Sequence, residues 1–178
     1  MRVKSIFPKI IIAFFLGLCL SIGFHPDNTI ASVFQIAEAY PEYLNGDKDY
    51  ICCDGHMGTA FYVVASSLNV EKYDPPQYII AVDVASARSA IDDENDFYRN
   101  GGAGKITDVR RHRFFYNWDL RRMYVDSHGN DDWRYLDPKG DWAHTGIVMP
   151  AGQVAFLLAY DTEFYSRYNH LADLVRNR

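Results

Sequence analysis

The residues best suited to chemistry stand together early in the chain: Cys52, Cys53, Asp54 and His56. Thiolate, carboxylate and imidazole groups are the usual protein ligands of zinc. Adjacent cysteines chelate one ion poorly, however, and no other His or Cys stands at metal-ligand spacing. No metal site is predicted. The expected state is two buried free thiols, with a strained vicinal disulfide or pairing between chains as the alternatives.

A second acidic run, Asp126–Asp132, is similar to a calcium loop at first sight. An EF-hand loop that begins at Asp126 needs Gly at its sixth position and Glu at its twelfth. Asp131 and Asp137 occupy those two positions. Because Asp, Ser, Gly and Asn favour tight turns, the run predicts a turn between strands.

Catalytic machinery is not indicated by any motif. Ser66 and Ser67 follow a strand signal, but the sequence shows no base to activate a hydroxyl and contains neither G-x-S-x-G nor S-x-x-K. The glycine-rich run 101–104 lacks the Lys-Ser/Thr of a phosphate-binding loop. Asp83 lies between apolar residues, so we expect it to pair with Arg110 or Arg113 across strands. The sequence predicts no catalytic residue, no cofactor and no enzyme.

Tryptophan residues are the remaining candidates for a functional site. Trp118 stands at a predicted hairpin tip, whereas Trp133 and Trp142 stand near predicted turns. Exposed rings at such places stack on sugars or contact protein partners. These three residues are therefore the candidate partner-binding residues, and the alternative for Trp133 and Trp142 is that they cap the core.

Strand signals dominate the middle of the chain. Short β-rich runs are separated by Gly, Pro, Asn and Asp, and the 15% aromatic content suits a pleated surface. The run Tyr78–Val84 is apolar on both sides through Val82, which predicts a central strand. Ser86–Gly104 reads as a long surface loop. The other expected strands are Tyr50–Cys53, Ala60–Val64, Leu68–Tyr73, Ile106–Tyr116, Arg121–Val125 and Trp133–Leu136.

The last segment changes to helical spacing. Apolar residues from Val154 to Val175 recur every three or four positions, and Pro150 fits a first helical turn. Strands followed by one helical segment predict an α+β fold: an antiparallel sheet of about six to eight strands with a C-terminal helix packed on one face.

The N-terminal segment predicts export. Arg2, Lys4 and Lys9 precede an apolar run from Ile10 to Ile22, which has the length of a signal-peptide core. We expect residues 1–31 to be the signal peptide, with cleavage after residue 39 as the alternative. Residues 32–49 form a lead-in, and residues 50–178 form one globular domain. Lipidation and an uncleaved anchor remain open, and so does the final location: periplasm, cell surface or medium.

Charge argues against one class of partner. Removal of Arg2, Lys4, Lys9 and Asp27 with the signal leaves 15 of the 18 Lys and Arg and 22 of the 23 Asp and Glu. Nucleic-acid binding needs clustered Lys and Arg, so an acidic domain is not expected to bind it. Contact with a membrane is expected only through the signal peptide before cleavage.

Several segments together resemble a known layout. In order they are a strand running into a serine corner, a central strand, a hairpin, a Trp-containing strand and the lead into a helix. The layout is similar to that of uncharacterised exported bacterial proteins and of the surface-adhesin protein E family. The resemblance implies an antiparallel sheet with an attached C-terminal helix. The segments are Phe61–Leu68, Tyr78–Val84, Phe115–Val125, Trp133–Leu136 and Met149–Phe156.

The expected function is therefore that of an exported, non-enzymatic envelope or surface protein that binds a protein partner, in the manner of an adhesin. The partner would be a host, matrix or envelope protein, and a homodimer is kept open. Two alternatives remain: an envelope enzyme or enzyme inhibitor with an unrecognised site, and a glycan-binding protein that uses exposed Trp residues.

Overall fold

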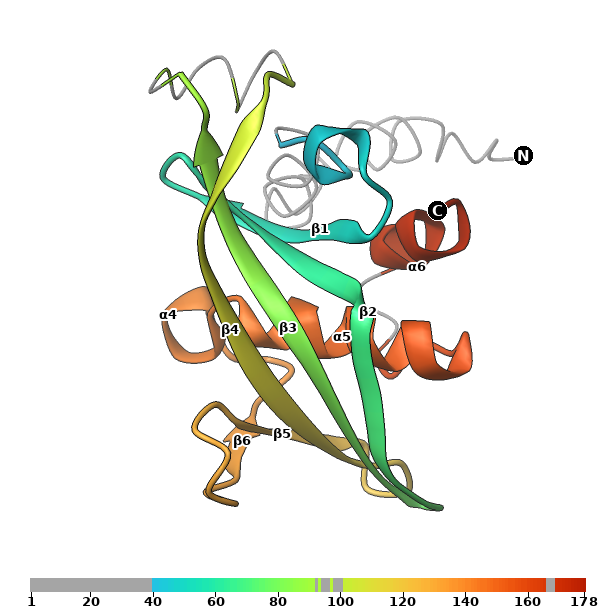
Figure 1. The fold of residues 1–178 in the computed structure, drawn as a ribbon. Helices are drawn as coiled ribbons and strands as arrows, with labels where there is room; N and C mark the ends of the chain where they lie inside the picture. The colour runs from blue at the N-terminus through green and yellow to red at the C-terminus, as the bar shows by residue number, and fades with distance from the viewer. Residues whose placement is uncertain (1–39, 92, 94–96, 98–100, 166–168) are drawn as a thin grey trace, which may run out of the picture. The chain divides into compact units, whose positions relative to one another are not determined.

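The computed structural model describes residues 40–178 except 92, 94–96, 98–100 and 166–168. The predicted signal peptide and the first part of the lead-in lie outside the described residues. The expected α+β fold is confirmed: a six-stranded antiparallel sheet curls around C-terminal helices that pack on one face (Figure 1). No helix among the described residues is long and apolar enough to span a membrane.

The strands follow one another in the sheet in the order of the chain, and each is antiparallel to its neighbour. β3 and β4 are long and central, which agrees with the central position expected for Tyr78–Val84. The strands are β1 Tyr50–His56, β2 Thr59–Asp74, β3 Gln77–Ser89, β4 Gly104–Asn117, β5 Arg122–Asp126 and β6 Arg134–Leu136.

One strand replaces two expected ones. Ala60–Val64 and Leu68–Tyr73 are the two halves of β2, which bends at the serine corner and shifts its pairing register there. The Ser67 hydroxyl accepts the backbone N–H of Asp83 on β3 (2.8 Å) and donates to the carbonyl of Val64 (2.6 Å). The hydroxyl takes the place of ladder hydrogen bonds, so the strand bends without leaving the sheet.

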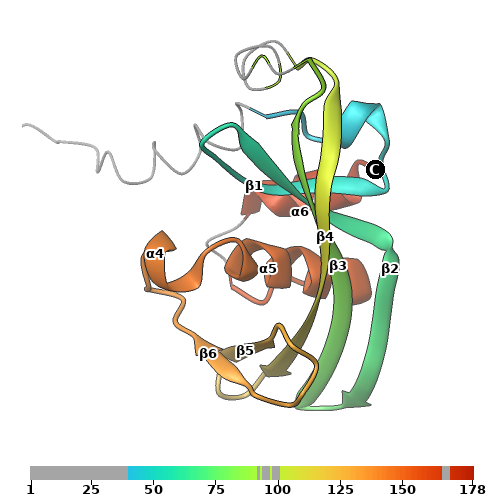
Figure 2. The ribbon, with the colours of Figure 1, turned by 60° about the vertical axis from the view of Figure 1, so that its left-hand side comes forward.

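The inner face of the sheet, defined as the face that packs against the helices, forms the main core. Helix α5, Val148–Tyr160, is buried over its first ten residues and crosses the strands inside the curl (Figure 2). At Gly152 the helix approaches the sheet so closely that a Cβ atom would lie 2.6 Å from Met123 Sδ. The Tyr116 hydroxyl also donates to the Gly152 carbonyl (2.7 Å).

The helical segment is divided rather than continuous. Asp161 adopts a left-handed conformation (φ 48°) that ends α5, and α6 spans Asn169–Arg176. Leu171 and Val175 of α6 still pack into the main core, so the apolar spacing read from the sequence belongs to two helices. A third, short helix, α4, spans Trp142–Thr145 and is capped by the Asp141 carboxylate.

A second, smaller core lies on the outer face, defined as the face turned away from α5, at one end of the sheet. Tyr40 and Leu44, from the second half of the lead-in, are buried there, and Leu44–Gly46 forms the 3-10 helix η1. The Asn45 side chain bonds both the N–H (2.8 Å) and the carbonyl (3.0 Å) of Gly104, which fixes η1 to the start of β4. The members of this core are Tyr40, Leu44, Cys52, Ala60, Tyr62, Ala87 and Phe97.

Candidate functional site

The other end of the outer face carries a row of aromatic rings. Phe115 on β4 is paired with Tyr124 on β5, and Tyr124 is paired with Tyr135 on β6. Paired residues of an antiparallel sheet point to the same face, so the three rings stand side by side. Their centroids are 5.6 Å and 5.4 Å apart, and Trp133 lies 5.9 Å from Phe115. We call Phe115, Tyr124, Trp133 and Tyr135 the aromatic row.

The aromatic row is partly open to solvent. Tyr135 is 45% exposed, and the other three rings are half-buried by one another and by neighbouring side chains. The rings are not coplanar: the interplanar angle is 33° between Phe115 and Tyr124 and 57° between Tyr124 and Tyr135. Such a surface offers apolar area with hydroxyl groups at its rim, which suits contact with a shaped partner.

A cluster of ionised groups borders the aromatic row. The Arg113 guanidinium binds the carboxylates of Asp126 (2.9 Å), Asp131 (2.7 Å) and Glu71 (2.9 Å). It also lies 5.1 Å from the Trp133 ring centroid, within cation–π range. The three carboxylates raise the pKa of Arg113 further above its usual value. Arg113 is thereby held in one orientation beside the aromatic row. We call these four charged residues the Arg113 cluster.

Asp126 organises the acidic turn that follows β5. Its carboxylate accepts the backbone N–H groups of His128 (3.0 Å), Gly129 (2.8 Å) and Asp131 (2.9 Å). Burial tends to raise the pKa of Asp126, but these donors and Arg113 together hold the pKa below its usual value. The predicted turn at Asp126–Asp132 is present, and the Asp126 carboxylate that organises it is paired with Arg113.

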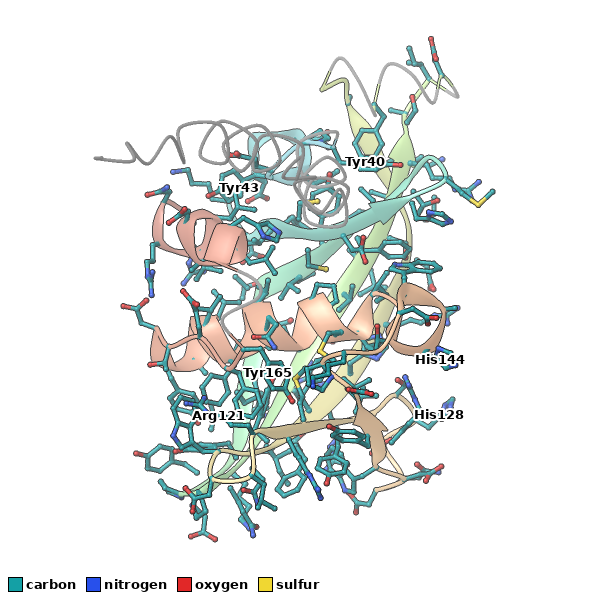
Figure 3. All side chains as sticks on the ribbon, turned by 180° about the vertical axis from the view of Figure 1, so that it is seen from behind. Tyr40, Tyr43, Arg121, His128, His144 and Tyr165 are labelled. Carbon is teal, nitrogen blue, oxygen red and sulfur yellow. The ribbon has the colours of Figure 1, made fainter. Side chains whose placement is uncertain are left out.

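The candidate tryptophans do not come together. Trp118 does lie in the β4–β5 turn, but its ring is half-buried and stacks on Phe156 of α5 at 5.7 Å. Arg121 covers the Trp118 ring at 3.7 Å, and the Tyr165 hydroxyl donates to the Arg121 carbonyl (3.0 Å). Arg121 and Tyr165 are labelled close together in Figure 3. Trp118 is thus part of the rim of the main core.

Trp133 and Trp142 differ from each other as well. Trp133 belongs to the aromatic row, on the outer face. Trp142, in α4, is 49% exposed; its Nε1 donates to Asp54 Oδ2 (3.0 Å), and its ring lies 4.7 Å from that of His56. Burial raises the pKa of Asp54, and the Trp142 hydrogen bond opposes that rise. Only Trp133 therefore stands among other rings on an open face.

The cysteines are buried free thiols, as the sequence predicts. Cys52 points into the small outer core and Cys53 into the main inner core, because neighbours in a strand face opposite sides. Burial raises the pKa of Cys52 to about 12 and that of Cys53 well above its usual value. Within the described part of the chain, no three His, Cys, Asp or Glu side chains are grouped so that they could hold a metal ion.

Asp83 forms a cross-strand ion pair, but with a different partner from the expected ones. Its carboxylate binds Arg111 (2.9 Å), its register partner on β4. Arg110 faces the opposite side of β4 and binds Asp108 (2.7 Å), while Arg113 belongs to the Arg113 cluster. Alternation along β4 excludes Arg110, which faces the other side, and the register places Arg111 rather than Arg113 opposite Asp83.

One polar pair could not be found from the sequence. Nδ1 of His112, a buried residue on β4, lies 3.1 Å from the Ser127 hydroxyl in the acidic turn. Burial and Arg110 lower the pKa of His112, and Asp83 opposes that change. Within the described residues no carboxylate is hydrogen-bonded to this imidazole, so the pair lacks the third group of a triad. We assign it a structural role in holding the turn against β4.

A shallow pocket of about 310 Å³ lies between η1 and the start of β4. Asn45 and Gly104 meet there through the amide contacts described above. The pocket supplies one carboxylate, one phenol and otherwise apolar or amide groups, so it presents no catalytic set. Its lining residues are Leu44, Asn45, Asp47, Tyr50, Gly104 and Ile106.

Comparison with known proteins adds no family to this description. No family model, no curated protein and no solved structure matches the chain.

Proposed function

We propose that this chain is an exported, non-catalytic envelope domain that binds a protein partner through the aromatic row. The observation that carries the proposal is the alignment of four aromatic side chains on the face of the sheet opposite α5. A partner that covers these rings removes apolar area from water, at roughly 25 cal/mol per Å². Residues of these types, Tyr, Trp and Arg, dominate the energetics of protein interfaces.

The charges beside the aromatic row support binding of a shaped surface. Arg113 is fixed by three carboxylates and stacks on Trp133, so little side-chain entropy is lost when a partner contacts it. Arg122, exposed at the start of β5, and Asp131 add charges of both signs near the rings. A partner with a central apolar patch and a charged rim fits this arrangement.

The ring angles favour a protein over a linear polysaccharide. A flat sugar chain stacks best on rings that lie in one plane. The rings here are inclined at 33° to 58° to their neighbours. Inclined rings form ridges and hollows instead, and apolar protein side chains pack into hollows of that kind.

The N-terminal segment and the resemblance to the surface-adhesin protein E family support the cellular part of the proposal. A basic start and an apolar run of signal-peptide length are typical of exported chains. Cell fractionation with N-terminal sequencing tests this part by itself. Recovery of the protein in the cytoplasm with an intact N-terminus would contradict export.

Site-specific photo-crosslinking in the producing cells tests the binding surface. A photoreactive phenylalanine derivative at position 135 should yield a discrete protein adduct that mass spectrometry can identify. The matched control is the same derivative at Met57, which is 79% exposed on the β1–β2 turn. Equal adducts at both positions, or none at position 135, would contradict the proposal. Glycan-array binding that is lost in Trp133→Ala, without a protein adduct, would replace it with sugar binding.

A further inference from the structure

The first half of β4 has an open edge. β5 pairs with β4 only between Arg113 and Asn117, so no described strand lies beside Lys105–His112 on that side. The backbone groups of Gly104 are already bonded to the Asn45 side chain. Lys105 to Arg111 are exposed without interruption. Backbone N–H and C=O groups along such an edge are free to pair with another strand. We call Lys105–His112 the open edge.

The open edge combines apolar and charged side chains. Val109 is 51% exposed and Ile106 is 37% exposed, both on the outer face. Asp108 and Arg110 flank Val109 and project from the other face, where they bind each other at 2.7 Å. Many proteins protect an edge with charged side chains, especially Lys. Here the two charges are opposite and symmetric about Val109, which permits pairing with an identical strand.

We propose that the open edge binds the same edge of a second copy of this chain, antiparallel, with Val109 of both copies facing each other across a twofold axis. In this register Asp108 of each copy lies opposite Arg110 of the other. Unlike charges directly opposite each other stabilise an antiparallel pair, and like charges destabilise it. The two sheets would then join into one continuous sheet.

Charge selects this register over its neighbours. A twofold axis through residue 108 would place Asp108 against Asp108 of the second copy. An axis through residue 110 would place Arg110 against Arg110. A shift by a single residue would turn the outer face of one copy toward the inner face of the other. The irregular pairing near Ser86 and Ala87 of β3 places a bulge at Thr107. This bulge limits the new ladder to the residues close to Val109.

The proposed dimer is independent of the proposed function. The aromatic row uses the second half of β4 together with β5 and β6, so it stays free on both copies. A short ladder buries a small area, and association is therefore expected to depend on protein concentration. Two aromatic rows in one dimer would also make binding to a partner bivalent.

Analytical ultracentrifugation of the mature chain over a concentration series tests the proposal. The wild type should show a monomer–dimer equilibrium. Asp108→Arg alone and Arg110→Asp alone should each weaken the dimer about tenfold or more, because each places two like-charge pairs opposite each other. The double variant Asp108→Arg/Arg110→Asp should recover the wild-type dissociation constant, because it restores unlike pairs.

A charge change elsewhere provides the control. Asp119→Arg, exposed in the β4–β5 turn, carries the same charge change as Asp108→Arg and should leave association unchanged. Circular dichroism should show that every variant is folded. A wild type that stays monomeric, single variants that dimerise normally, or a double variant that does not recover would each overturn the proposal.

The register has its own test. Val109→Cys should form a disulfide-linked dimer on mild oxidation, because facing residues across an antiparallel pair are close enough for a disulfide. Ile91→Cys, at a position that is 68% exposed and distant from the axis, is the matched control. Equal crosslinking of the two variants would overturn the proposed register.

Discussion

Phe114 and Phe115 are neighbours in β4, yet they have opposite environments. Phe114 is fully buried under α5, in contact with Tyr116 and close to Gly152. Phe115 lies on the outer face among Tyr124 and Trp133, with solvent on one side. Both faces carry aromatic rings over this part of the sheet. What distinguishes the two sets of rings is the helix that covers the inner set.

This comparison shows why aromatic content alone does not locate a binding surface. Alternation along β4 divides the rings between two faces, and each set aligns with rings on neighbouring strands. One set contributes to stability because α5 covers it. The other set remains available to a partner. The following predictions concern three pairs of adjacent residues on the two faces.

The largest difference is expected at Phe114 and Phe115 themselves. Phe114→Ala should lower the free energy of unfolding by about 3–5 kcal/mol, because it leaves a cavity beneath α5. Phe115→Ala should lower it by only about 1 kcal/mol, the scale of a cross-strand aromatic pair. Urea unfolding followed by circular dichroism measures both. Equal losses would show that the outer face is as tightly packed as the inner one.

Val125 and Asp126 form the second pair. Val125 points into the main core, whereas Asp126 lies on the outer face and is nevertheless buried. Asp126→Asn should cost about 2–4 kcal/mol, because Arg113 loses a buried charged partner and three N–H groups lose a carboxylate acceptor. Urea unfolding at neutral pH measures the loss.

The stability that the Asp126 carboxylate contributes should depend on pH. The pKa of Asp126 is lower in the folded chain than the value of about 3.9 for an unfolded one, so the charged form stabilises the fold. This contribution is fully present above about pH 5 and is lost as the pH falls through the lowered folded value. The difference in the free energy of unfolding between wild type and Asp126→Asn should therefore decrease as the pH falls from about 5 towards about 1, over the part of this range in which the protein stays folded. A constant difference would contradict this account of Asp126.

Cys52 and Cys53 form the third pair, and here both faces are covered. Neither thiol should react with iodoacetamide at pH 8 in the folded chain, because both are buried and burial raises both pKa values. Both should react after unfolding in urea. Mass spectrometry counts the labels. Rapid labelling of Cys52 in the native chain would mean that the small outer core does not exclude solvent at this end of the sheet.

Much of the fold could be predicted because its signals are local. The period-two runs, the Asp74–Pro76 break and the helical spacing near the C-terminus placed the strands and the covering helices close to where they lie. The serine corner was recognised as a break, but the pairing of Ser67 with Asp83 keeps β2 in one piece. The division between α5 and α6 depends on the left-handed conformation of Asp161. No Gly or Pro near Asp161 marks the end of a helix in the sequence.

The candidate site could be predicted less well, because it depends on register. Trp118 was selected for its place in a turn, and α5 covers it. Tyr124 and Tyr135 were overlooked, although the short β4–β5 connection sets Asn117 opposite Arg122 and thereby Phe115 opposite Tyr124. Counting back from that turn would have found the first pair. Nothing in the sequence indicated that the outer face is covered at one end and open at the other.

The Arg113 cluster has a further consequence. Loops rich in aspartate commonly depend on a dissolved cation to neutralise them, and such loops loosen when that ion is scarce. In this protein the positive charge belongs to the chain itself and is carried by a neighbouring strand. Once the sheet has formed, Arg113 of β4 neutralises Asp126 and Asp131 in the turn after β5. The shape of this turn should be the same in calcium-poor and calcium-rich surroundings.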